Sequence, residues 1–185
     1  MHHAVIRDAV RQRLVELHGE PPDTLLRDEL GLCLGATRAD VAAVNGHIVG
    51  CEIKGAQDRL SRLEGQVDLY GRVVDEAVLV VEGKHTGRAV DLLPDWWGVW
   101  VAEDVDGAAV LHEARPASRN PAVDPLAVAQ LLWRDEVYGL LEQHGGTARL
   151  SKATRWQLWE QLVERLPLED LQRVVREGLR ARREW

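Results

Sequence analysis

The Asn45-Gly46 pair, which separates two apolar runs, constrains the fold more than any other feature of the sequence. Residues 39–44 before it and residues 48–54 after it are rich in Val, Ile and Ala. Asn-Gly between two such runs is a strong hairpin signal, because both residue types tolerate the backbone conformations of tight turns. We therefore expect two adjacent antiparallel strands here, to which the rest of a sheet can be added.

The charged residues of this hairpin bear on its register. Alternate residues of a strand point to one face, so Glu52 and Lys54 are neighbours there. A two-residue turn would put Asp40 on the other face. A three-residue loop with Gly46 in the left-handed conformation, or an equivalent bulge, puts Asp40 beside Glu52 and Lys54. We favour this second register because it gathers an apolar set on the opposite face, namely Val41, Ala43, Val49, Cys51 and Ile53.

The remaining apolar patterns predict an α/β fold with a C-terminal helical extension. Residues 4–18 and 57–74 have helical spacing, and residues 77–81 form a wholly apolar run, typical of a strand buried on both faces. A helix between strands indicates a crossover that makes those strands parallel. Other segments predict a strand or short helix at 24–34, a helix at 86–93, strands at 99–102 and 108–112, and helices at 125–144, 151–166 and 168–183.

The chain is expected to divide into a core at residues 1–115, a linker at residues 116–124 and a helical region at residues 125–185, packed on or beside the core. The seven tryptophans, with Trp133 and Trp156 among them, are assigned mainly to core packing rather than base stacking. No apolar run is long enough to span a membrane, and the first residues lack the pattern of a signal peptide. We therefore expect a cytoplasmic protein without a membrane partner.

Charge is distributed unevenly along the chain. The net charge is −7, yet residues 145–185 carry nine Lys/Arg against six Asp/Glu. A local basic surface of this kind is compatible with DNA as a partner, although a solvated helix face would show the same pattern. The candidate DNA-binding residues are Arg38, Arg59, Arg62, Lys152, Arg155, Arg173, Arg176 and Arg180. A glycine-rich phosphate loop is missing, so a nucleotide cofactor is not implied.

Asp40, Glu52 and Lys54 are the residues most suggestive of chemistry. Two nearby carboxylates repel each other unless a cation lies between them, and hard oxygen ligands suit Mg²⁺ or Mn²⁺. Such an ion can activate water, and Lys54 could orient that water or neutralise a phosphate. The alternative is a cross-strand ion pair on a solvated sheet face.

The spacing of these residues resembles the signature of the PD-(D/E)XK nuclease superfamily. Within that superfamily, the chain is similar to a bacterial branch of uncharacterised proteins related to the MmcB-like DNA-repair group. Ala39-Asp40 replaces the usual Pro-Asp, and Gly55 stands where relatives often carry Ser. The matching segments are 29–32, 38–42, Asn45-Gly46, 50–54, a helix with Leu63, Gln66 and Tyr70, and 132–136.

The resemblance implies a restriction-endonuclease-like αβββαβ core and a Mg²⁺-dependent nuclease that hydrolyses DNA in repair or in the processing of foreign DNA. Asp40, Glu52 and Glu29 would be metal ligands, Lys54 the catalytic lysine, and Gln66 a further site residue. For Glu29 and Gln66 the alternative is a solvated surface position. The alternative function is a catalytically inactive DNA-binding or adaptor protein of the same fold, and a homodimer is compatible with either function.

Overall fold

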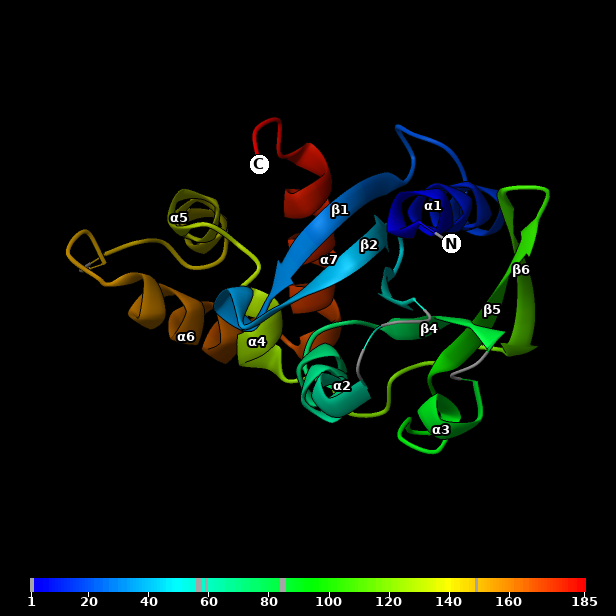
Figure 1. The fold of residues 1–185 in the computed structure, drawn as a ribbon. Helices are drawn as coiled ribbons and strands as arrows, with labels where there is room; N and C mark the ends of the chain where they lie inside the picture. The colour runs from blue at the N-terminus through cyan, green and yellow to red at the C-terminus, as the bar shows by residue number, and fades with distance from the viewer. Residues whose placement is uncertain (1, 56–57, 59, 84–85, 149) are drawn as a thin grey trace.

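A six-stranded mixed sheet in the order β1-β2-β3-β4-β5-β6 forms the centre of the molecule (Figure 1). The computed structural model describes residues 2–55, 58, 60–83, 86–148 and 150–185. The α/β class expected from the sequence is therefore confirmed. The strands are β1 (Leu25–Leu32), β2 (Thr37–Val44), β3 (Ile48–Lys54), β4 (Glu76–Glu82), β5 (Gly98–Val105) and β6 (Ala108–Arg115). The helices are α1 (His3–His18), α2 (Leu63–Gly71), α3 (Thr86–Val90), α4 (Pro125–Ala129), α5 (Arg134–Gln143), α6 (Arg155–Arg165) and α7 (Leu168–Ala181), with short 3₁₀ turns at Cys33–Gly35 and Leu60–Arg62.

The β2–β3 hairpin has the three-residue loop that the charge pattern favoured. Val44 pairs with Ile48, which leaves residues 45–47 as the loop. The Asn45 amide donates to the His47 carbonyl, and the His47 amide donates to the Asn45 side chain. Gly46 does not adopt the expected left-handed conformation. The expectation for Gly46 was wrong because the Asn45 side chain, rather than a left-handed glycine, closes the loop.

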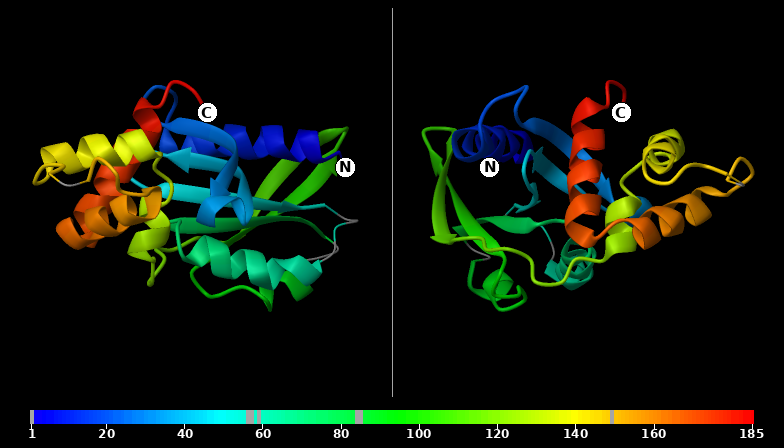
Figure 2. Two further views of the ribbon diagram at one scale, coloured as in Figure 1. Left: turned by 90° about the vertical axis from the view of Figure 1, so that its left-hand side faces the viewer. Right: turned by 180° about the vertical axis from the view of Figure 1, so that it is seen from behind.

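The two faces of the sheet carry different partners. On one face, Ile6, Val10 and Leu14 of α1 pack against the apolar set predicted from the register, and all five members of that set are buried there. The other face is covered by α2 and by the C-terminal helices, as the views from the side and from behind show (Figure 2). This second face also carries Glu52 and Lys54 of β3, so the covering helix α2 determines their environment.

The connections follow the expected crossover, with shorter helices. Strands β3 and β4 are parallel and α2 lies between them in the chain; β4 and β5 are also parallel, and β5 and β6 form an antiparallel pair. Where one helix was predicted at residues 57–74, the chain forms a 3₁₀ turn followed by α2. Gln57 lies outside the described residues. The helix predicted at 86–93 is likewise only the short α3.

The prediction of one helix over residues 125–144 is wrong, because the helix is interrupted between α4 and α5. Trp133 has an extended backbone, and its amide donates to the Glu136 carboxylate at 2.7 Å. This side-chain cap begins a new helix at Arg134, because it satisfies an amide that would otherwise have no partner within the helix. Asp124 caps α4 in a similar way by accepting from the Leu126 and Ala127 amides.

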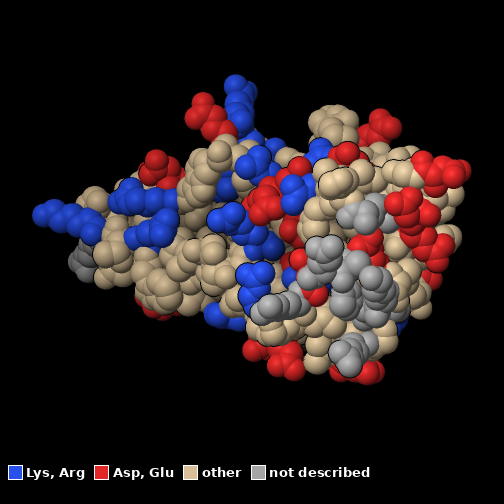
Figure 3. Space-filling view, in the orientation of Figure 1, with Lys and Arg blue, Asp and Glu red and all other residues tan. Residues whose placement is uncertain are grey.

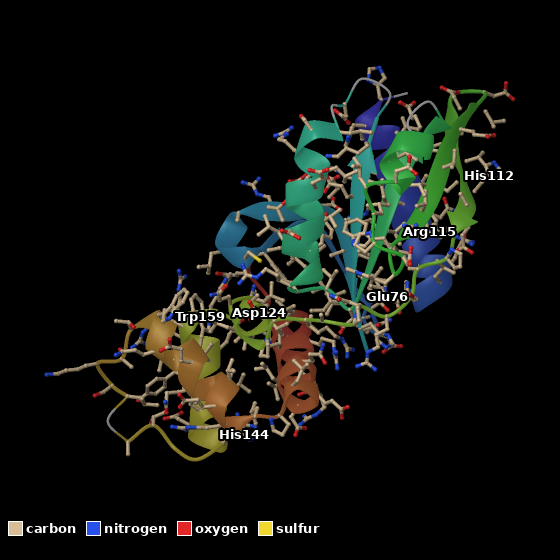
Figure 4. The ribbon with its side chains drawn as sticks, turned by 90° about the horizontal axis from the view of Figure 1, so that it is seen from below. Glu76, His112, Arg115, Asp124, His144 and Trp159 are labelled. Carbon is tan, nitrogen blue, oxygen red and sulfur yellow. The ribbon has the colours of Figure 1, made fainter. Side chains whose placement is uncertain are left out.

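The C-terminal helical region shares its hydrophobic core with the sheet. Leu132, Trp159 and Val175 belong to the same buried cluster as Leu79 and Val81 of β4. Residues 116–124 run over the core with several backbone hydrogen bonds, including Ser118 to Trp96 and Asp124 to Arg72. Asp124 lies at the boundary between the two parts (Figure 4). Among the described residues, no helix is long and apolar enough to cross a bilayer.

A buried polar junction fastens α7 to the sheet. Asp75, just before β4, is almost fully buried and accepts from the Ile48 amide at 2.7 Å. Gln172 of α7 donates to its other oxygen at 2.8 Å, and Arg176 lies 3.4 Å away. Because a buried carboxylate is stable only with such partners, this junction fixes where α7 lies on the sheet.

Candidate functional site

Glu52, in the middle of β3, is the centre of the polar cluster on the sheet face beneath α2. Its side chain accepts hydrogen bonds from Lys54 Nζ at 2.6 Å, from Gln66 Nε2 at 2.6 Å and from the Tyr70 hydroxyl at 2.9 Å. Lys54 also donates to Gln66 Oε1 at 2.9 Å. Glu52 is only 3% exposed. The alternative of an ion pair on a solvated sheet face is therefore wrong, because α2 covers this face.

The cluster follows from the geometry of its two elements. Glu52 and Lys54 are two residues apart on a strand and point to one face. Gln66 and Tyr70 are four residues apart on α2 and lie on one side of that helix. Burying two charges is costly, and their mutual attraction offsets that cost only when the remaining polar atoms are also hydrogen bonded. The amide of Gln66 and the hydroxyl of Tyr70 meet that need.

Asp40 lies beside this cluster but bonds to different partners. The paired residues of β2 and β3 extend to Val41 and Cys51. Next to this pair, Asp40 Oδ2 accepts from the Ile53 amide at 2.7 Å. Asp40 Oδ1 lies 4.0 Å from Arg7 of α1. The Asp40 carboxylate therefore takes the place of a backbone carbonyl as the acceptor for the Ile53 amide. It is oriented towards α1 rather than into the Glu52 cluster.

Glu29 adjoins Asp40 from the next strand. It lies between the paired positions Asp28–Val41 and Leu30–Ala39, so it is opposite Asp40. Its backbone has a φ of 53°, which L-residues rarely adopt. Its side chain accepts from Arg7 at 2.9 Å and lies 3.8 Å from the exposed Arg38.

The electrostatics of the site are dominated by burial. Burial, and after it the nearby charge of Glu52, raise the pKa of Asp40 to about 6, although the hydrogen bond from Ile53 opposes the rise. Burial also raises the pKa of the Tyr70 hydroxyl well above its usual value, with Glu52 as the next cause. The raised pKa of Asp40 means that its surroundings disfavour the negatively charged form of the side chain.

The donor types at this site suit a hard divalent cation, but their present geometry is that of a hydrogen-bonded cluster. Within the described ranges, no group of three or more His, Cys, Asp or Glu side chains is arranged to hold a metal. Both carboxylate oxygens of Glu52 already accept from Lys54, Gln66 or Tyr70. Asp40 has a pKa raised by burial and then by the charge of Glu52, so its environment disfavours the ionised carboxylate.

The predicted DNA-binding residues fall into two groups. Arg173, Arg176 and Arg180 are engaged within the fold: the first with Asp170 and Glu177, the second with Asp75, and the third with the Pro22 carbonyl. The other group is exposed and, apart from Arg38 near Glu29, has no ion pair with an acidic residue in the described part of the chain, while Arg59 lies outside the described residues. The exposed group comprises Arg38, Arg62, Lys152 and Arg155.

Sequence reasoning missed two partners at the site. Tyr70 was named in the helix that carries the resemblance but was given no role at the site, although its spacing of four residues from Gln66 places both on one helix side. Arg7 of α1 lies 22 residues before Glu29, and nothing in the local sequence pairs them. Only the position of α1 on the sheet brings Arg7 to Asp40 and Glu29.

Fold and site together define a mixed α/β protein with a buried lysine–carboxylate cluster beneath a crossover helix. The chain belongs to the bacteriophage P4 protein cII family, whose sequence model matches residues 3–184. It is 24% identical over 156 residues to protein cII of Enterobacteria phage P4, an alignment that covers 83% of this chain and 57% of that protein. The chain thus spans little more than half the length of that relative. No solved structure matches the chain.

This family membership corrects the functional expectation. Membership of the PD-(D/E)XK superfamily, and with it the Mg²⁺-dependent deoxyribonuclease acting in repair or on foreign DNA, was wrong, because the phage P4 cII family accounts for nearly the whole chain. The alternative of an inactive nuclease relative loses its basis as well. The D…ExK spacing is a loose motif. Two neighbouring strands can carry it for a structural reason, namely a buried ion pair such as the one that Glu52 forms with Lys54 here.

The pKa of Asp40 predicts an unusual pH dependence of stability. The folded-state pKa of about 6 lies above the ordinary value of 3.8, so ionising Asp40 opposes folding. This contribution favours folding below pH ~4 and is lost as the pH rises through ~6. At ~1.4 kcal/mol per pKa unit, the always neutral Asp40→Asn variant should gain ~2–3 kcal/mol in unfolding free energy at pH 8 and little at pH 4.

Urea denaturation at both pH values measures this difference. Asp28→Asn is the matched control, because Asp28 lies on the neighbouring edge strand β1 and pairs with Arg11 at a partly exposed position. Its effect should stay within ~1 kcal/mol at both pH values. A pH-independent effect of Asp40→Asn would contradict the assignment.

Proposed function

We propose that this chain is a DNA-binding protein whose contact surface is the basic side of its C-terminal helical region. The observation that carries the proposal is the separation of charge: residues 145–185 carry an excess of Lys and Arg, whereas the chain as a whole is acidic. Figure 3 shows Lys and Arg extending from the helical region towards the middle of one face, and Asp and Glu gathered mostly at the opposite end. A polarised surface of this kind attracts the phosphates of DNA to one side of an acidic protein.

The first turn of α6 has the features of a phosphate contact. Lys152 and Arg155 are exposed, and neither has an acidic partner among the described residues. Thr154 caps the helix by accepting from the Gln157 amide. The N-terminal end of a helix carries a partial positive charge, which adds to the attraction that these two cations exert on an anion. Arg62, before α2, is a further exposed cation without an acidic partner in the described part of the chain.

The paired substitution Lys152→Glu with Arg155→Glu tests the proposal. Fluorescence anisotropy with labelled DNA should show binding by the natural protein that weakens as salt is raised, and a loss of at least ~10-fold in affinity in the double variant. Arg13→Glu, at an exposed position of α1, is the charge control and should bind nearly as the natural protein does. Equal losses in the control and the double variant, or no binding by the natural protein, would contradict the proposal.

We further propose that Asp40, with Glu52, binds Mg²⁺ or Mn²⁺ as a structural or phosphate-bridging ion. The support is the proximity of two acidic side chains, because Glu52 is the second cause, after burial, of the raised pKa of Asp40. A divalent cation between two carboxylates relieves such repulsion, and carboxylate oxygens are its preferred ligands. To share the ion, Glu52 would have to exchange part of its hydrogen bonding with Lys54, and the Asp40 carboxylate would have to turn from Arg7 towards Glu52.

Isothermal titration calorimetry with Mg²⁺ and with Mn²⁺ tests this site. The natural protein should bind at pH 8 and more weakly below pH ~6, because protons compete for Asp40. Asp40→Asn should abolish binding, and Asp28→Asn should leave it unchanged. Heat of binding that is the same in Asp40→Asn as in the natural protein would overturn the proposal, as would no heat at all.

The order α1-β1-β2-β3-α2-β4 supports one proposal about the fold itself. It is the αβββαβ order of a restriction-endonuclease-like core, and we propose that this chain has a core of that type. The support is the order of elements together with the mixed sheet, in which β2–β3 is antiparallel and β3–β4 parallel. Such a fold carries many functions, so it adds nothing to the choice of activity.

A further inference from the structure

Two tryptophans assigned to the core from their spacing lie instead at the surface. Trp133 and Trp156 are each 46% exposed, and Trp185 is 37% exposed. Trp133 and Trp185 both contact Arg182, so they form one surface feature. Large aromatic side chains left open to water on a protein surface often mark a binding site.

Arginine side chains link the indoles of Trp133 and Trp185 into a layered arrangement. The guanidinium of Arg182 lies 4.1 Å from the ring centre of Trp133 and 4.5 Å from that of Trp185. The guanidinium of Arg27, on β1, lies 4.7 Å from the ring centre of Trp185. We call these four side chains the Trp–Arg cluster. Its positive charge comes from Arg27, because Arg182 is paired with Glu136. Aromatic faces beside a positive charge are the composition of sites that hold unpaired nucleobases.

Hydrogen bonds within the protein hold Arg182 and the backbone of Trp133 in place. The Arg182 side chain is only 5% exposed, and it donates to both carboxylate oxygens of Glu136 at 2.8 and 2.6 Å. It also donates to the Leu131 carbonyl at 3.0 Å. The amide of Trp133 donates to the same Glu136 carboxylate, which fixes the start of α5. The Trp133 ring packs against this fixed guanidinium, so it loses little conformational entropy when a planar group stacks on it.

A purely structural role would be to fasten the end of α7 to α5 and β1. That role explains Arg182, whose polar atoms are satisfied inside the protein. It does not explain why about half of the Trp133 surface stays open to solvent. Burying that indole would have stabilised the fastening further, since apolar area removed from water is favourable.

We propose that the Trp–Arg cluster stacks an unpaired base of single-stranded DNA, with Trp133 as the stacking platform, Arg182 as the group that fixes the platform, and Arg27, over the Trp185 ring, as the positive charge of the cluster. The proposal rests on the DNA-binding function above and specifies the form of DNA. The flat faces of duplex bases are covered by their neighbours, whereas an unpaired base offers its face to an aromatic ring. The chain therefore binds single strands more tightly than duplexes.

Anisotropy titrations with three labelled probes test this directly. The probes are a short mixed-sequence single strand, its duplex, and an abasic strand with the same phosphates but without bases. The natural protein should prefer the single strand over both of the others. Trp133→Ala should lower single-strand affinity by about tenfold and leave abasic-strand affinity unchanged, because only a base can stack. Trp133→Phe, which keeps an aromatic face, should retain most of the affinity.

A control separates stacking from loss of packing. Trp96→Ala removes a partly buried indole elsewhere on the core, and should leave the preference among the three probes unchanged. Equal binding of single strand, duplex and abasic strand, with dependence on Lys152 and Arg155 retained, would overturn the stacking site while the DNA-binding function stands. Equal effects of Trp133→Ala on the single strand and the abasic strand would also overturn it. Absence of binding to every probe would overturn both proposals.

Discussion

The buried contact between Glu52 and Lys54 on β3 is the interaction on which the arrangement of the site depends. A carboxylate and an ammonium that lie within a sheet need both each other and further hydrogen bonds. Gln66 and Tyr70 supply those bonds from α2, so the ion pair also selects how the crossover helix lies on the sheet. The apolar residues of the same strand point to α1, and the hairpin register places the two sets on opposite faces.

The hairpin was predictable because strand geometry has a period of two. A choice between two registers assigned five apolar residues and the Glu52–Lys54 pair to their correct faces. The junction of Asp75 with Gln172 was not predictable, because 97 residues separate them and only the packing of α7 brings them together. The break before α5 was missed for a local reason, since Glu136 caps the Trp133 amide and apolar spacing does not reveal a cap. Trp133 was assigned to the core for the same reason.

The functional expectation was wrong because it relied on a short motif and left out the groups that the motif residues contact. Asp40, Glu52 and Lys54 have the residue types of a metal-dependent hydrolytic site, yet Lys54 neutralises Glu52 directly and Asp40 bonds to Ile53. The chain belongs to the phage P4 cII family. What its own surface supports is binding, with exposed cations at the start of α6 and exposed indoles that contact arginines near the end of α7. These two features lie outside the segment that first suggested chemistry.

A double-mutant cycle on Glu52 and Lys54 tests the central claim most directly. Urea unfolding would compare the natural protein with Glu52→Gln, Lys54→Met and the double variant. If the buried pair organises the site, each single variant loses ~3–5 kcal/mol, because it leaves one charge uncompensated, and the double variant loses clearly less than the sum. Single losses that simply add in the double variant would show that the two residues act independently, and would contradict the account.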